Sequence, residues 1–113
     1  MLSYKNRLIK RGDFKAVYRH GRPLFCAIIG LKVIKNSIGE SRIGISIGIK
    51  FSKKAVERNR IKRQIREIFR KNIGKLKETV DIVVFVKKAE CSTINTKELE
   101  KMITEALSKG KLI

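Results

Sequence analysis

Hydrophobic residues recur along this 113-residue chain with a strand period in some segments and a helical period in others. Residues 42–49 (RIGISIGI) alternate strictly, which predicts a strand with its four isoleucines on one face. The other face holds only Arg42, Gly44, Ser46 and Gly48. So bare a face indicates either close packing of a helix or neighbouring strand, or close approach of a ligand backbone.

Two further segments are predicted to form strands because they are rich in β-branched residues. Residues 24–34 (LFCAIIGLKVI) are interrupted by Gly30, which predicts one bent strand or two strands with a kink or bulge between them. Residues 80–87 (VDIVVFVK) are apolar enough to lie inside a sheet. The run NSIGES, before the alternating strand, predicts a turn.

Helical spacing appears near both ends of the chain. In RGDFKAVYRHGR, Phe14, Val17 and Tyr18 fall at i, i+3 and i+4, with Asp13 as the expected N-cap and Gly21 as the expected C′ residue. A second amphipathic stripe ends near Gly110 and is expected to face the core. Its members are Leu99, Met102, Ile103, Ala106 and Leu107.

Residues 53–70 (KKAVERNRIKRQIREIFR) contain eight Lys or Arg and neither Gly nor Pro. If residues 53–72 form one helix, an apolar sector about 100° wide packs against the sheet. That sector holds Ile61, Ile65, Ile68 and Phe69. A second sector, centred about 120° away, is polar and strongly basic. It holds Asn59, Lys62, Arg63, Arg66 and Arg70. Arg58 projects into the apolar sector, so we expect it to serve the fold as well as a ligand.

The excess of positive charge points to a polyanionic partner. Lys and Arg number 28 against 10 Asp and Glu, a formal charge of +18. Glu57 and Glu67 are the only acids in the basic stretch, so most of its cations lack a partner at i, i+4. Arginine binds phosphate oxygens bidentately, which favours nucleic acid. A membrane surface fits less well, because the apolar side is needed for the core and the chain has no Trp. Composition alone leaves DNA and RNA both open.

The remaining features indicate a single domain over residues 1–113, without a disulfide framework or zinc site. Cys26 and Cys91 lie far apart with no Cys or His cluster around either, so both are expected to be reduced thiols. His20 is the only histidine and predicts no acid–base site. The N-terminus lacks a secretory signal and no apolar run approaches a membrane span, so we expect a cytoplasmic protein.

The segment AVERNRIKRQIREIFR, preceded by RIGISIGIK and by RGDFKAVYRHGR, resembles the protein subunit of bacterial ribonuclease P. The resemblance covers most of the chain in the expected order. It implies an α/β two-layer sandwich in which a mixed four-stranded sheet is combined with three helices and a left-handed βαβ crossover. It also implies a protein that binds a catalytic RNA subunit and the 5′ leader of precursor tRNA, and assists endonucleolytic removal of the leader.

On the same resemblance, the RNA holds the catalytic Mg²⁺ ions. The protein alone is then expected to bind no cofactor or metal, to carry no catalytic residue, and to need neither a membrane nor an obligate protein partner. Arg58, Asn59 and Arg60 carry the RNR signature. Ten residues are expected to contact the RNA subunit: Lys50, Lys53, Lys54, Arg58, Asn59, Arg60, Lys62, Arg63, Arg66 and Arg70.

Phe14 and Tyr18 are the expected leader-binding residues, although by spacing alone each fits the core as well as a stacking surface. The sequence departs from the family pattern at two positions. Phe51 follows Lys50 where the family usually has a second basic residue. Lys32 stands where many members have an aromatic residue, which leaves that part of the leader cleft open.

Two other functions share some of these features. An RNA-binding module of the ribosomal type would also have a basic helix on a small α/β fold. A metal-dependent nuclease would need clustered carboxylates, whereas the acids here are scattered. Glu98, Glu100 and Glu105 fall on a helix face that we expect to be solvated.

Overall fold

The structure is a computed structural model and describes residues 2–26, 28–48, 51–86 and 95–113. Within these ranges the chain forms three α-helices, two short 3-10 turns and one four-stranded sheet. In chain order the elements are η1 (Tyr4–Asn6), α1 (Arg11–His20), β1 (Arg22–Cys26), β2 (Ile29–Lys35), β3 (Arg42–Ser46), α2 (Ala55–Asn72), η2 (Ile73–Lys75), β4 (Val80–Val86) and α3 (Thr96–Lys109).

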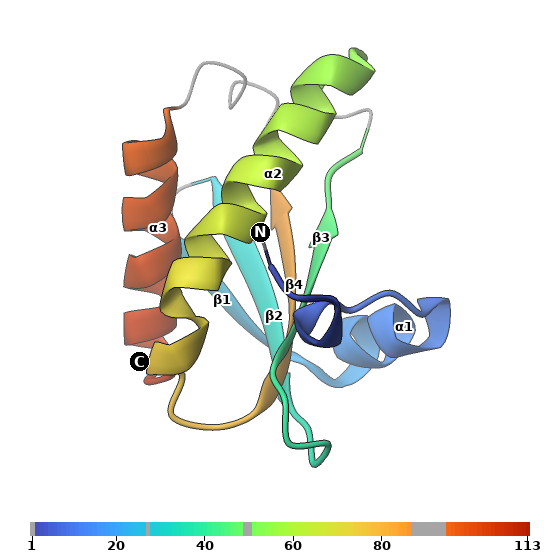
Figure 1. The fold of residues 1–113 in the computed structure, drawn as a ribbon, viewed down its shortest axis with the longest axis vertical. Coiled ribbons are helices and arrows are strands. Elements are labelled where there is room, and N and C mark those ends of the chain that lie inside the picture. The colour runs from blue at the N-terminus through green and yellow to red at the C-terminus, as the bar shows by residue number, and fades with distance from the viewer. Residues whose placement is uncertain (1, 27, 49–50, 87–94) are drawn as a thin grey trace.

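The sheet is mixed, with strand order β1-β2-β4-β3. β2 pairs antiparallel with both β1 and β4, whereas β3 and β4 are parallel and are connected through α2. In Figure 1, α2 lies in front of the sheet and β4 lies to the left of β3, with both strands running upward. The crossover is therefore left-handed, the rare hand for such a connection. This hand places α2 on the same face of the sheet as α3, and the expected fold class is confirmed.

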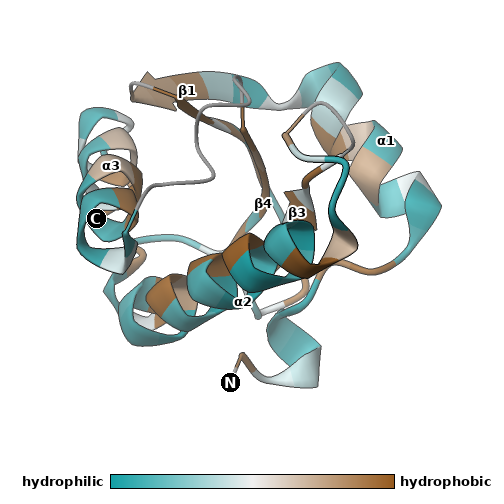
Figure 2. Cartoon of the chain, turned by 90° about the horizontal axis from the view of Figure 1, so that it is seen from above, coloured by the Kyte–Doolittle hydropathy of each residue, from teal (hydrophilic) through white to brown (hydrophobic). Residues whose placement is uncertain are grey.

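The main hydrophobic core lies between the sheet and the pair α2 and α3 (Figure 2). The apolar sector of α2 is buried as predicted, with exposed fractions of 1% or less for its four members. The stripe of α3 is also confirmed, and Met102 packs against the core from a half-buried position. Ile82 and Val84 of β4 meet these helices, because alternate residues of a strand face the same side.

A smaller cluster holds α1 on the opposite face of the sheet (Figure 2). Val17 of α1 and Val83 of β4 are fully buried there, and Phe14 packs beside them. The bare face of β3 is explained by this contact. A Cβ added to Gly44 would lie 2.6 Å from the Phe14 ring, so only glycine allows the helix to approach so closely. The helix-packing interpretation of that face is confirmed.

The predicted ends of α1 were wrong in detail. Lys10, and not Asp13, is the N-cap residue, because Asp13 lies inside the first turn. Its carboxylate instead forms an ion pair with Arg42 at 3.2 Å, and this tertiary contact takes the place of capping. Gly21 does follow the helix, but its extended backbone (φ −72°, ψ 147°) is not the left-handed conformation of a C′ glycine.

The strand boundaries also differ from the prediction. Residues 24–34 belong to two strands, but the chain reverses between Cys26 and Ile29, so the expected interruption at Gly30 was wrong. Gly30 pairs regularly inside β2. β3 ends at Ser46, and Ile47 is buried beyond it. Residues 49 and 87 of the two predicted strands lie outside the described residues.

The candidate reactive groups show no catalytic arrangement within the described residues. Cys26 is a free, buried cysteine whose Sγ donates a hydrogen bond to Glu105 at 3.1 Å. Burial, reinforced by this carboxylate, raises the pKa of the thiol, as in an unreactive structural cysteine. His20 is exposed at the end of α1. Cys91 lies outside the described residues.

Candidate nucleic-acid interface

The polar face of α2 is held outward by the burial of its apolar face. Ile61 and Ile65 are completely buried, so the polar sector lies on the part of the helix surface that is not packed in the core. Asn59, Arg63 and Arg70 are exposed, and the rest of the predicted polar sector is half-buried. We call Lys62, Arg63 and Arg66 the α2 cations. The fold therefore presents them on a rigid element.

The α2 cations have no hydrogen bond or ion pair through their side chains to any other described residue. Arg70 differs, since its Nε donates to Glu67 Oε1 at 2.9 Å. The hydrogen bond from Arg70 lowers the pKa of Glu67 to about 2, and Glu67 in turn raises the pKa of Arg70. One of the predicted contact residues is thus partly neutralised by the chain itself. The three α2 cations, by contrast, keep a local excess of positive charge.

The residues of the RNR signature have different environments. Arg58 is half-buried and its Nη1 donates to the Ser52 carbonyl oxygen at 2.8 Å, which confirms its expected contribution to the fold. Asn59 is exposed, and Arg60 is half-buried. Ser52 also donates from Oγ to Glu57 at 2.5 Å and accepts from the Lys54 backbone N–H at 3.1 Å. These contacts fix the start of α2.

Two of the three lysines predicted before α2 are described. Lys53 and Lys54 are exposed, with Lys54 at the N-cap position of α2. Lys50 lies outside the described residues. Phe51, which departs from the family pattern, is 5% exposed and belongs to the main core. Its side chain therefore anchors the loop that carries the lysines.

The two predicted leader-binding aromatic residues have different environments. Phe14 is half-buried against the small cluster under α1, whereas Tyr18 is 40% exposed. Lys32 contacts the second of them, because its Nζ donates to the Tyr18 carbonyl oxygen at 3.0 Å. Lys32 thus ties the end of α1 to the sheet.

A partly buried ionic network fixes the start of α1 to the same face. Arg42 forms a forked pair with Asp81 through Nε at 2.9 Å and Nη2 at 2.6 Å, and contacts Asp13 through Nη1 at 3.2 Å. Its pKa is raised, chiefly by the hydrogen bond to Asp81. Asp81 also accepts from Asn36 Nδ2 at 2.8 Å. These contacts hold α1 in place over β3 and β4.

Sequence reasoning missed a pair of aromatics on the sheet. Phe25 of β1 is 46% exposed, and its ring meets Phe85 of β4 edge to face with centroids 6.1 Å apart. Gly30 lies between them in β2, and a Cβ there would lie 2.4 Å from the Phe85 ring. The sequence contains one signal for this pair, which is the alternation of side chains between the two faces along each strand. It indicates that Phe25 and Phe85 share a face only once the register of the strands is known.

Sequence reasoning also missed Arg7, which lines a hollow together with Arg63, Arg66 and Glu67. Arg66 borders a second hollow that contains Phe14, so the predicted RNA-subunit and leader residues meet there. No motif in the sequence marks Arg7. Only the fold brings the N-terminal segment against α2.

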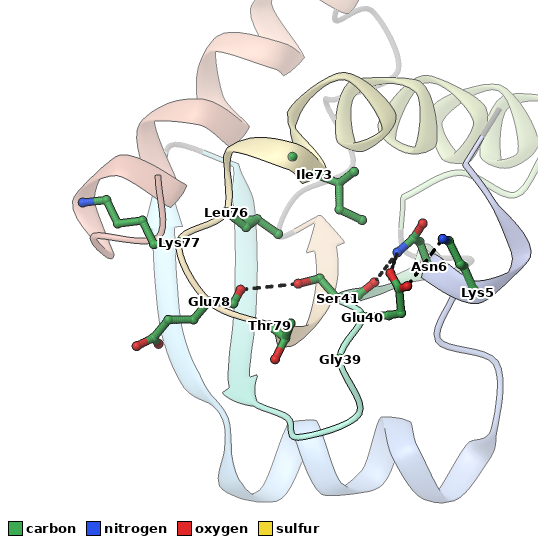
Figure 3. Close-up of a pocket in the computed structure, with 11 residues that line it drawn as sticks. Lys5, Asn6, Gly39, Glu40, Ser41, Ile73, Leu76, Lys77, Glu78 and Thr79 are labelled. Carbon is green, nitrogen blue, oxygen red and sulfur yellow. Dashed lines mark hydrogen bonds and ion pairs between the residues drawn. The ribbon is translucent and has the colours of Figure 1, made fainter.

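A different hollow, of about 350 Å³, lies at the end of the molecule where α2 leads into β4 (Figure 3). Its main polar groups pair with one another. Asn6 Nδ2 donates to the Ser41 carbonyl oxygen at 2.9 Å, and Lys5 pairs with Glu40 at 3.4 Å. This arrangement joins the N-terminal turn to the start of β3 and is structural.

The acidic residues of α3 do not converge on a metal site. Glu98 and Glu105 are exposed and Glu100 is half-buried. Across the described residues, no group of three or more His, Cys, Asp or Glu side chains is arranged to hold a metal ion. In the same part of the chain, every helix is too short or too polar to cross a bilayer.

Comparison with known proteins decides between the families that such a surface fits. The family model described as Ribonuclease P matches residues 2–111. The chain belongs to the ribonuclease P protein family. It is 40% identical to the ribonuclease P protein component of a Pseudanabaena species over 114 aligned positions, covering 100% of this chain and 97% of the relative.

Solved structures agree with this family assignment. The RNase P protein of Staphylococcus aureus superposes with a TM-score of 0.85 at 28% identity, covering 95% of this chain and 96% of that one. The RNase P protein of Thermotoga maritima gives 0.81 at 33% identity, covering 91% and 96%. The resemblance that was based on the RNR segment is therefore confirmed over nearly the whole chain.

Proposed function

We propose that the chain binds the RNA subunit of ribonuclease P through the α2 cations and the lysines before α2, and assists removal of the 5′ leader from precursor tRNA. The observation that supports this function best is the set of three cations on α2 without partners among the described residues. Like charges one turn apart repel, and phosphate groups remove that repulsion while accepting bidentate hydrogen bonds.

In this proposal the protein supplies positive charge and the RNA supplies the chemistry. Bringing the RNA subunit and precursor tRNA together requires two polyanions to approach, and a protein of charge +18 lowers their repulsion. Mg²⁺ is held by the RNA, and its effective affinity rises because the protein stabilises the folded complex. The protein contributes positioning groups, and no step of bond cleavage passes through its side chains.

The leader is proposed to lie on the α1 face of the sheet. Tyr18 offers an exposed ring at the end of α1, and Phe14 lies closer to the sheet. Phe25 and Phe85 add an aromatic pair on the same sheet face, because they share the side-chain parity of Val83. Unpaired bases stack on such rings with little regard to sequence.

Reconstitution with a ribonuclease P RNA at low Mg²⁺ tests the function directly. We expect the chain to restore cleavage of precursor tRNA under conditions in which the RNA alone is inactive. The chain without RNA is expected to leave the precursor intact. Failure to restore cleavage would contradict the assignment, and cleavage by an RNA-free preparation would revive the nuclease alternative.

The contact residues are tested by the salt dependence of RNA-subunit binding. Arg63→Gln and Arg66→Gln are each expected to weaken binding and to flatten the slope of log K against log salt by about 0.7 to 0.9. Lys101→Gln is the matched control, because it removes one exposed cation from α3. Slopes for the two arginine variants that equal the Lys101 control would refute the proposed surface.

A further inference from the structure

Two neighbouring hollows share Arg7 and Arg66 as their common border. The first, of about 280 Å³, is basic and is completed by Arg63 and Glu67. The second, also about 280 Å³, is lined mainly by apolar residues, and Tyr4 and Phe14 are among them. A guanidinium cluster beside an aromatic hollow matches the two halves of a nucleotide, its phosphate and its base.

Arg7 is held in a fixed position by contacts with the N-terminal segment and β3. It is half-buried, and its Nε donates to the Leu2 carbonyl oxygen at 3.0 Å. The segment itself lies along β3, where Arg7 bridges to Ile43 and the Leu8 N–H donates to the Ile43 carbonyl oxygen at 2.9 Å. Within the described residues only the Nε of Arg7 is engaged, so its two Nη groups remain for a ligand.

Tyr4 is held beside this cluster by a short turn. It begins η1, in which the Asn6 N–H donates to the Ser3 carbonyl oxygen at 2.9 Å and the Arg7 N–H donates to that of Tyr4 at 3.0 Å. The side chain of Tyr4 is nonetheless 77% exposed. A large ring exposed on an ordered turn is available for stacking.

We propose that the N-terminal segment and α2 form a binding site for one unpaired nucleotide of RNA. Arg7, Arg63 and Arg66 hold its phosphate, and its base stacks on Tyr4. A single strand is favoured over a duplex because only an unstacked base exposes its face to an aromatic side chain. The proposal deepens the proposed function and depends on it only in naming RNA as the polymer.

The test measures the affinity of the full chain for a fluorescein-labelled single strand of ten uridines across a range of salt concentrations. Arg7→Gln is expected to weaken binding about tenfold and to lower the salt slope by about 0.7. Arg7→Lys should keep the slope yet bind at least about threefold more weakly, because the planar fork is lost. Lys5→Gln is the matched control, since Lys5 is a neighbouring exposed cation paired with Glu40, and should stay within about twofold of the unmodified chain.

Substitutions of Tyr4 test the proposed stacking of the base separately. Tyr4→Ala is expected to weaken binding at least about fivefold, whereas Tyr4→Phe should bind as the unmodified chain does. Because this side chain is 77% exposed, the substitution leaves folding intact even if Arg7 variants do not fold. The inference is overturned if Tyr4→Ala binds normally, if Arg7→Gln matches Lys5→Gln, or if an RNA duplex of equal length competes as well as the single strand.

These outcomes are separable from those of the proposed function. If Arg63→Gln weakens binding of the RNA subunit while the Arg7 and Tyr4 variants are neutral toward the single strand, the nucleotide site is wrong and the function stands. If the Arg7 and Tyr4 variants lose single-strand affinity while the chain fails to restore precursor cleavage, the site stands and the function is wrong.

Discussion

Removal of Arg42 is expected to destabilise the fold more than removal of any cation on α2. Arg42→Met takes both forked hydrogen bonds, at 2.9 and 2.6 Å, away from Asp81, which is only 6% exposed. The carboxylate would keep Asn36 as its remaining side-chain donor, at 2.8 Å. Breaking a buried ion pair by removing one partner destabilises a protein by about 3 to 5 kcal/mol. The Arg42 side chain is 22% exposed, so water replaces part of the interaction and we expect about 3 kcal/mol.

Urea unfolding followed by far-UV circular dichroism gives the change in the free energy of unfolding. Asp13→Asn is the matched comparison, because it removes only the single contact at 3.2 Å between partly exposed side chains. That contact should contribute about 1 kcal/mol or less. A loss of less than about 1 kcal/mol for Arg42→Met, or an equally large loss for Asp13→Asn, would contradict this prediction.

A second variant separates the loss of the pair from the loss of packing. Replacing a buried ion pair by apolar residues of similar size is often neutral, since neither charge then remains unpaired. Arg42→Met combined with Asp81→Leu should therefore be more stable than Arg42→Met alone. Equal stability of the two variants would mean that the unpaired Asp81 carboxylate is not the source of the loss.

Two further predictions concern the packing of α1 and the surface of α2. Gly44→Ala should lower stability by about 1 to 3 kcal/mol in thermal unfolding, because its Cβ would lie 2.6 Å from the Phe14 ring; a normal melting temperature would contradict the tight packing of α1. The pKa of Glu67, lowered to about 2 by Arg70, means that this pair stabilises the fold above the ordinary glutamate pKa and is lost as the pH falls toward 2. Carboxyl NMR should show the low midpoint, and Arg70→Gln should raise it; a midpoint unchanged by that substitution would exclude Arg70 as its cause.

The helices that cover the main core were predictable because their periodicity is set by burial alone. The apolar sector of α2 and the stripe of α3 each meet one broad surface, so the spacing of Ile61, Ile65 and Ile68 was sufficient. The exposed cations followed from the same projection. The partner of Arg70 was not anticipated, although Glu67 lies at the helical spacing i, i+3.

The remaining features depend on contacts between segments distant in the sequence. Asp13 has the residue type of an N-cap, but its ion pair with Arg42 on β3 decides its role. Gly30 looks like a strand interruption, yet it pairs regularly in β2. Its residue type is explained by the ring of Phe85, which occupies the space that a side chain would need. Such roles emerge only from the register of the strands, which the sequence pattern left open.

The left-handed crossover determines on which face of the sheet α2 and its cations lie. A right-handed connection between β3 and β4 would put α2 on the face that α1 occupies. The left-handed one puts α2 with α3, so that α2 buries Ile65 in the main core while Arg66, the next residue, borders the hollow shared with Arg7. Displacing the α2 cations would require unpacking side chains that are completely buried. The backbone positions of the α2 cations are therefore fixed by the core beneath them, and in the proposed complex phosphate groups would meet side chains that start from a fixed spacing along the helix.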